Sequence, residues 1–193
     1  MITLSNLRNI GLGLAMAGLC SLGAVAQSNT NNSNSTNAMG TAKHMTASER
    51  MFIRKAAEGG KAEVELGKLA QEKAASPEVK QFGERMVNDH SKANDQLKEV
   101  AQKEGVTLPT KLDAKDAATK ARLEKLSGEA FDRAYMKDMV ADHTKDVREF
   151  KNEAKNGKDP DVKSFAAQTA PTLEDHLKEA KNIAPKTMAQ ITH

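Results

Sequence analysis

Two short segments with the same pattern most restrict the fold of this chain, because each one fixes where a long helix begins. They are SPEVKQF at residues 76–82 and DPDVKSF at residues 159–165. In both, a side chain that can cap a helix precedes a proline, which suits the first helical position because its missing N–H would be unpaired there anyway. The same valine, lysine and phenylalanine then follow at the same spacing. The repeat predicts two helical hairpins whose second helices each start at this motif.

Similar signals bracket the other helices. The segment TASE at residues 46–49 places Thr and Glu at the spacing of a capping box and predicts a helix start at Thr46. Gly105, Gly157 and Pro185 are helix-ending signals at the other ends. The four predicted helices cover residues 46–75, 76–105, 128–156 and 159–184.

The predicted fold class is all-α: a ferritin-like four-helix bundle made of two helical hairpins. A long crossover, with a short accessory helix over residues 112–126, joins the hairpins. Few aromatic residues (no Trp, one Tyr, five Phe) and many Ala, Lys, Glu and Leu residues agree with helices throughout. The bundle domain is expected over residues 46–185 and a C-terminal tail over 186–193. The crossover suits a ferritin-like topology, while the accessory helix leaves a plain up-down topology open.

The N-terminal region is expected to lie outside this fold. Residues 1–26 carry Arg8, then an apolar run, then Ala24-Val25-Ala26, which is the pattern of a secretory signal peptide cleaved after Ala26. Residues 27–45 are rich in Ser, Asn and Thr and predict a flexible linker. The protein is therefore expected to be exported, as a periplasmic or secreted protein, with peripheral envelope association left open.

Charge and hydropathy exclude some partners. The formal net charge is only +3, and it falls by one when Arg8 leaves with the signal peptide, so nucleic acid is not expected as a partner. No second apolar run reaches the roughly 18–20 residues of a membrane span, so no integral membrane segment is expected. An envelope protein partner and a homo-oligomer both remain open.

An Asp-His pair recurs on three of the predicted helices. The chain has five histidines, and His90, His143 and His176 each follow an aspartate and fall within the apolar stripe of a helix. The remaining long helix has Glu63 in its apolar stripe, where a carboxylate is costly unless it is paired or bound to a cation. All four residues lie at similar heights in antiparallel hairpins, and they are expected to converge in one layer.

Three imidazoles and one carboxylate suit a mononuclear site for zinc, iron, manganese or copper. The aspartate before each histidine points about 100° away around the helix, so it is placed to accept a hydrogen bond from a histidine of a neighbouring helix. Further candidates are carboxylates one turn after a histidine and methionines one turn before one. The additional or outer candidates are Asp89, Asp142, Asp175, Asp146, Glu179, Met86 and Met139. A metal-free Glu/His cluster held by hydrogen bonds is the alternative.

At these motifs the chain resembles the domain of unknown function 4142 family of exported bacterial proteins, which are often labelled outer-membrane proteins. The resemblance covers residues 49–184 and rests on EVELGKLA, SPEVKQF, MVNDH, FDRAYMKDMVADH and HLKEA. The resemblance implies a ferritin-like bundle, and the family has no established activity. Ferritin-like di-iron sites use Glu-x-x-His motifs, whereas Val87 and Leu173 stand three residues before His90 and His176. A mononuclear site therefore fits the sequence better than a di-iron site.

Three functions follow from these observations. The first is a metal-binding protein that serves storage, buffering or stress protection. The second is a structural or interaction protein of the cell envelope whose core histidines are satisfied by hydrogen bonds. The third is a metal-dependent oxidoreductase or hydrolase, which needs an open coordination position and a cavity that reaches solvent. No catalytic residue is assigned.

Overall fold

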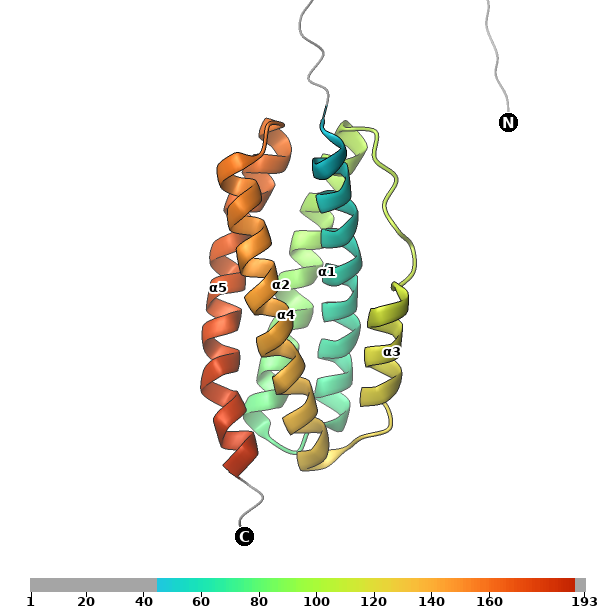
Figure 1. Ribbon diagram of the computed structural model, residues 1–193. Helices are drawn as coiled ribbons and strands as arrows, with labels where there is room; N and C mark the ends of the chain where they lie inside the picture. The colour runs from blue at the N-terminus through green and yellow to red at the C-terminus, as the bar shows by residue number, and fades with distance from the viewer. Residues whose placement is uncertain (1–44, 190–193) are drawn as a thin grey trace, which may run out of the picture. The chain divides into compact units, whose positions relative to one another are not determined.

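The computed structural model describes residues 45–189, which form five α-helices and no strand within that range (Figure 1). The predicted all-α fold is confirmed. The predicted signal peptide, nearly all of the predicted linker and residues 190–193 lie outside the described residues. None of the described helices has a stretch long and apolar enough to cross a membrane. The helices are α1 Ala47–Lys73, α2 Pro77–Lys103, α3 Ala114–Leu123, α4 Gly128–Asn156 and α5 Pro160–Ala189.

Local capping chemistry sets the helix starts. At α1, the Thr46 hydroxyl accepts from Glu49 N–H (3.2 Å), and the Glu49 carboxylate accepts from Thr46 N–H (2.8 Å), which completes the predicted capping box. Ser76 caps α2 ahead of its first-turn proline. Asp159 accepts from the backbone of Val162 (3.1 Å) at the start of α5. Each of these interactions satisfies a backbone N–H that has no partner inside the helix.

The helices pair as two antiparallel hairpins, α1 with α2 and α4 with α5, while α1 also packs on α4 and α2 on α5. The connection through α3 runs back along the bundle, so α4 starts at the same end as α2 and runs in the same direction (Figure 1). Parallel second and third long helices joined by a long crossover are the ferritin-like arrangement, and plain up-down topology is excluded.

The predicted domain ends need correction on both sides. Helix α5 does not stop before Pro185 but continues through it to Ala189. A proline removes only one backbone hydrogen bond, and the turns around it are anchored by Ile183 (5% exposed) and Thr187 (2% exposed). Met45, which was assigned to the linker, is 5% exposed and packs into the core. Burial of these side chains outweighs the local signals that placed the boundaries.

A polar layer divides the bundle core in two. One apolar cluster includes Leu66, Met86 and Met139, and the other includes Leu97 and Phe150. On every long helix, the layer residue falls between a residue of one cluster and a residue of the other. The layer consists of Glu63, His90, His143 and His176.

The α1–α2 hairpin depends on close backbone contact at Gly67. A Cβ at this position would stand 2.6 Å from the carbonyl oxygen of Gly83. Replacing Gly67 by alanine should therefore lower the free energy of unfolding by about 1–3 kcal/mol through overpacking. Gly59→Ala is the matched control, because a Cβ there meets nothing within 4 Å and should stabilise the helix by roughly 0.5–1 kcal/mol. Urea unfolding followed by circular dichroism measures the free energy of unfolding of both variants. An equal increase in the two would contradict the close contact at Gly67.

Candidate metal centre

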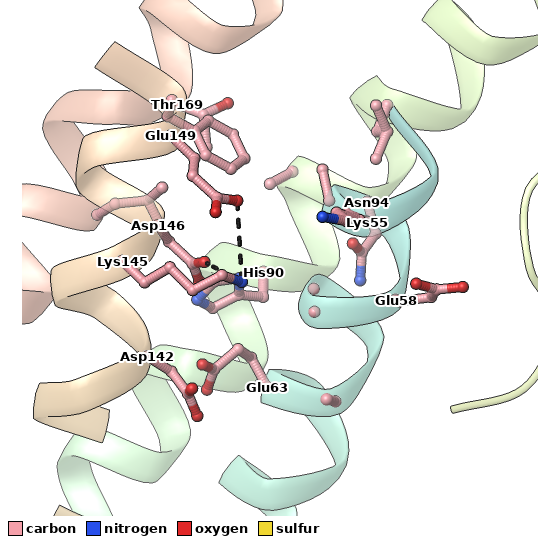
Figure 2. A pocket seen from close by; sticks show the side chains of 18 of the residues that line it. Lys55, Glu58, Glu63, His90, Asn94, Asp142, Lys145, Asp146, Glu149 and Thr169 are labelled. Atoms are coloured by element: carbon pink, nitrogen blue, oxygen red, sulfur yellow. Dashed lines mark ion pairs between the residues drawn. The ribbon is translucent and has the colours of Figure 1, made fainter. Parts of the chain in front are cut away.

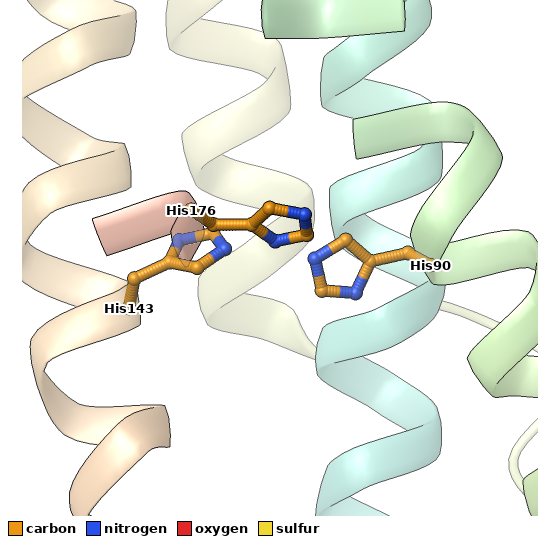
Figure 3. Close-up of side chains that lie close together, drawn as sticks. All are labelled: His90, His143 and His176. Atoms are coloured by element: carbon orange, nitrogen blue, oxygen red, sulfur yellow. The ribbon is translucent and has the colours of Figure 1, made fainter. Parts of the chain in front are cut away.

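The three histidines on different helices meet at the middle of the bundle. His90 comes from α2, His143 from α4 and His176 from α5, and their exposed fractions are 6%, 0% and 0%. One ring nitrogen of each lies within 4.8 Å of one ring nitrogen of both others. The ring centroids are 5.3–5.7 Å apart, and Figure 3 shows the rings turned toward one another between the helices. The structure therefore brings together the three histidines that the sequence placed at one height.

Hydrogen bonds fix which nitrogen of two of the rings is left free. His143 Nδ1–H donates to the carbonyl oxygen of Met139 (3.0 Å), because a carbonyl can only accept. His176 Nε2–H donates to the carboxylate of Asp89 (2.8 Å). His143 Nε2 and His176 Nδ1 then carry lone pairs. Both atoms are buried and have no hydrogen-bond partner among the residues that the structure describes, and the same holds for His90 Nε2. Metal-binding histidines in proteins have this arrangement, with one nitrogen held by a hydrogen bond and the other free.

Burial keeps the three imidazoles neutral. The pKa of His143 is lowered to about 3, mainly by burial and also by the neighbouring His176, although the Met139 carbonyl opposes the shift. Burial also lowers the pKa of His90 well below its usual range, and the two other histidines add to this shift. The pKa of His176 is lowered by burial although its bond to Asp89 opposes the shift. Neutral rings are the form that binds metal ions.

Glu63 borders the histidine cluster without joining it. Its side chain is buried, and Oε1 lies 3.8 Å from His143 Nδ1, which is the nitrogen already turned to Met139. Among the described residues, the mutually close set contains the three histidines and not Glu63. Burial raises the pKa of Glu63 well above its usual range, and the charges of Asp146 and Asp142 raise it further. Its Oε2 has no hydrogen-bond partner among the described residues, and burial favours the protonated form of this carboxyl group.

Comparison with known proteins identifies the family. The model for Domain of unknown function (DUF4142) matches residues 34–183, which is more than half of the chain. The chain belongs to the DUF4142 family. No curated protein matches it. A crystal structure of a DUF305 fragment from Deinococcus radiodurans is similar, with a TM-score of 0.65 and 15% identity over 74% of this chain and 98% of that chain. At this identity, the similarity supports the helical fold alone.

The three aspartates that precede the histidines have different surroundings in the DUF4142 chain. Asp89 makes the expected bond to a histidine of another helix, as it accepts from His176. Asp142 pairs instead with Lys115 on α3 (3.1 Å). The side chain of Asp175 is 68% exposed and lies 4.0 Å from Arg85. Only one of the three therefore supports a ring of the cluster.

The other predicted candidates differ from one another in their positions and contacts. Asp146 lines a cavity near Glu63, and burial raises its pKa to about 6. Glu179 binds Arg85 (2.6 Å) rather than a histidine. Met86 and Met139 are fully buried in the apolar cluster next to the layer, where they serve as core packing.

Two contributors were missed in the sequence. Arg85 holds Asp89 through its Nε (3.2 Å), and Asp89 in turn holds His176. The i,i+4 spacing of Arg85 and Asp89 was the signal that would have identified this pair. Tyr135 is fully buried, and none of the described residues is a hydrogen-bond partner of its hydroxyl. It lies two turns before His143 on the same face of α4, so the helical period was its signal.

A cavity of about 170 Å³ extends from the layer toward solvent. Glu63 and His90 line its inner part, and exposed residues such as Lys145 line its outer part. Figure 2 shows Glu63, Asp142 and Asp146 around this space. The histidine layer is therefore reachable from outside the bundle through His90.

A second acidic group, formed by Glu104, Asp159 and Asp161, lies near the start of α5. Asp159 caps this helix, and Lys103 pairs with Asp161 at 2.5 Å. These contacts account for two of its three carboxylates as parts of a helix cap and an ion pair.

Proposed function

We propose that this chain is an exported protein that binds one transition metal ion at His90, His143 and His176. The observation that carries the proposal is the convergence of three neutral imidazoles, each with a buried ring nitrogen that has no partner in the described part of the chain. A buried polar atom without a partner is costly, and His143 Nε2 and His176 Nδ1 cannot hydrogen-bond to each other because both carry lone pairs. A metal ion would satisfy all three at once.

The donor set favours metals that prefer nitrogen ligands. Three imidazoles suit zinc, copper and iron, whereas manganese prefers carboxylate and water oxygens. We propose that Glu63 acts beside this set by losing its proton when the cation arrives, because its buried carboxyl would then balance part of the metal charge. The biological role would be metal storage, buffering or stress protection in the envelope.

A metal-dependent hydrolase or oxidoreductase is the second candidate. The observation in its favour is the cavity that reaches His90 and Glu63, since a substrate must approach an open coordination position. Several carboxylates line this cavity, including Asp142 and Asp146. Their charge disfavours anionic substrates and favours cations, so we place metal binding first.

The test begins with the metal content of the chain purified without an affinity tag from the compartment to which it is exported. Inductively coupled plasma mass spectrometry should find about one transition metal ion per chain. The chelator-treated protein should take up one equivalent of zinc, copper or iron in calorimetric titration. Titration in two buffers that differ in ionisation enthalpy gives the number of protons released on binding. No metal in the isolated protein and no uptake on titration would overturn the proposal. A structural protein of the cell envelope would then be the remaining interpretation.

A further inference from the structure

The cavity beside the histidine layer is lined by residues of α1, α2, α4 and α5 and by residues at the start of α3. Its inner part reaches two buried polar groups, Glu63 (4% exposed) and His90 (6% exposed). Within residues 45–189, Glu63 Oε2 and His90 Nε2 have no hydrogen-bond partner. His143 and His176 do not line the cavity, so anything that arrives through it meets Glu63 and His90 first. Its volume of about 170 Å³ is large enough for several water molecules.

The wall between this inner part and solvent is acidic. Asp142 and Asp146 follow one another by one turn of α4, and both line the cavity together with Asp116 of α3. Figure 2 shows Asp142 and Asp146 on the side of the space that faces Glu63. Negative groups along a low-dielectric cavity concentrate cations and repel anions.

Two surface lysines hold these aspartates in the absence of another cation. Lys115 Nζ lies 3.1 Å from Asp142 Oδ1, and Lys145 Nζ lies 3.9 Å from Asp146 Oδ1. The lysine side chains are 66% and 47% exposed. Ion pairs this exposed contribute little stability, so an incoming divalent cation can displace the ammonium groups at small cost.

We propose that this cavity is the route by which a hydrated divalent cation reaches the three histidines, and that Asp142 and Asp146 form a transient cation site in its wall. This inference rests on the metal site proposed above and adds how that site is filled. The cation passes from the two aspartates to Glu63 and His90, and it then moves between the three rings. Its water molecules are exchanged for protein ligands in steps along this path.

Stopped-flow absorption of Co²⁺ uptake by the metal-free full chain tests the route. The variant with Asp142→Asn and Asp146→Asn together should bind Co²⁺ about tenfold more slowly, in the range expected for electrostatic focusing. Its dissociation constant should change by less than about threefold, because all three histidines remain. Lys145→Gln should accelerate uptake, because it removes the competing ammonium group.

The matched control carries Asp95→Asn and Glu99→Gln. Both residues are exposed on α2 and do not line the cavity, so the control loses the same charge and should keep the wild-type rate. Equal rates in the two double variants, with Co²⁺ still bound at equilibrium, would overturn the route alone. A wild-type chain that binds no metal at equilibrium would overturn the proposed function and the route with it.

Discussion

His143→Ala should abolish stoichiometric metal binding by the isolated domain. His143 is fully buried, its other nitrogen is held by the Met139 carbonyl, and its Nε2 has no partner among the described residues, so its loss leaves two of the three imidazoles. Loss of an outer partner of a ligand typically weakens binding 10–100-fold. Removal of a ligand itself should therefore weaken it by more than about 100-fold, which calorimetry and metal content both detect.

A graded series of variants separates the loss of a metal ligand from a general loss of the folded structure. Asp89→Asn should weaken metal binding by about 10–100-fold, because it alters the group that holds His176. Asp175→Asn should leave binding unchanged, because that carboxylate is exposed on the outside of α5. Thr144→Ala, at an exposed position beside His143, controls for changes in α4. Equal metal content across all four variants would contradict the histidine site.

The metal-free protein should lose stability as the pH falls below 6.5, and the buried histidines are the cause. In the folded state the pKa of His143 is about 3, whereas in the unfolded chain it is near 6.5. Between these values the unfolded state binds one more proton at this residue, so the free energy of unfolding decreases on acidification by about 1.4 kcal/mol per pH unit. The lowered pKa values of His90 and His176 act in the same direction.

Two carboxyl groups oppose this trend. The raised pKa values of Glu63 and Asp146 mean that the folded state binds their protons more tightly than the unfolded state. Their contribution to stability is therefore complete at low pH and is lost as the pH rises through the folded pKa, which is about 6 for Asp146. The net pH dependence is accordingly smaller than the histidines alone would give.

Comparison of wild type with His143→Asn isolates the histidine contribution. Urea unfolding of both metal-free proteins at several pH values between 4 and 7.5 should show the wild type losing its advantage on acidification. Below pH 6.5 the difference in unfolding free energy should shrink by about 1.4 kcal/mol per pH unit. Parallel curves for the two proteins would show that His143 is protonated in the folded state, and would contradict its burial as a neutral ring.

Much of the fold could be predicted from the sequence because helix starts and faces are local properties. Thr46, Ser76 and Asp159 cap their helices with side chains a few residues from the N–H groups that they satisfy. The 3.6-residue period then assigns each helix a buried face. In an antiparallel hairpin, residues at equal distances from the turn lie at the same height along the bundle. The convergence of His90, His143 and His176 followed from face and height alone.

Contacts between residues far apart in the sequence could not be predicted from capping and periodicity. Glu49 caps its own helix, and its other carboxylate oxygen accepts from the backbone of Lys158 and Asp159, more than a hundred residues away. Helix α5 continues past Pro185, and Thr187 in its last turn is buried. Nothing near these residues in the sequence indicates either contact, since both depend on which surfaces meet.

The sequence by itself determined the four long helices, their starts and the polar residue at the middle of each core face, because capping and periodicity act within a few residues. Only the tertiary structure decided the ferritin-like crossover, the choice of Asp89 as the partner of His176, the position of Glu63 beside the histidine cluster and the cavity lined by Asp142 and Asp146. Each of these depends on how the helices pack against one another, and that packing involves the two apolar clusters as a whole.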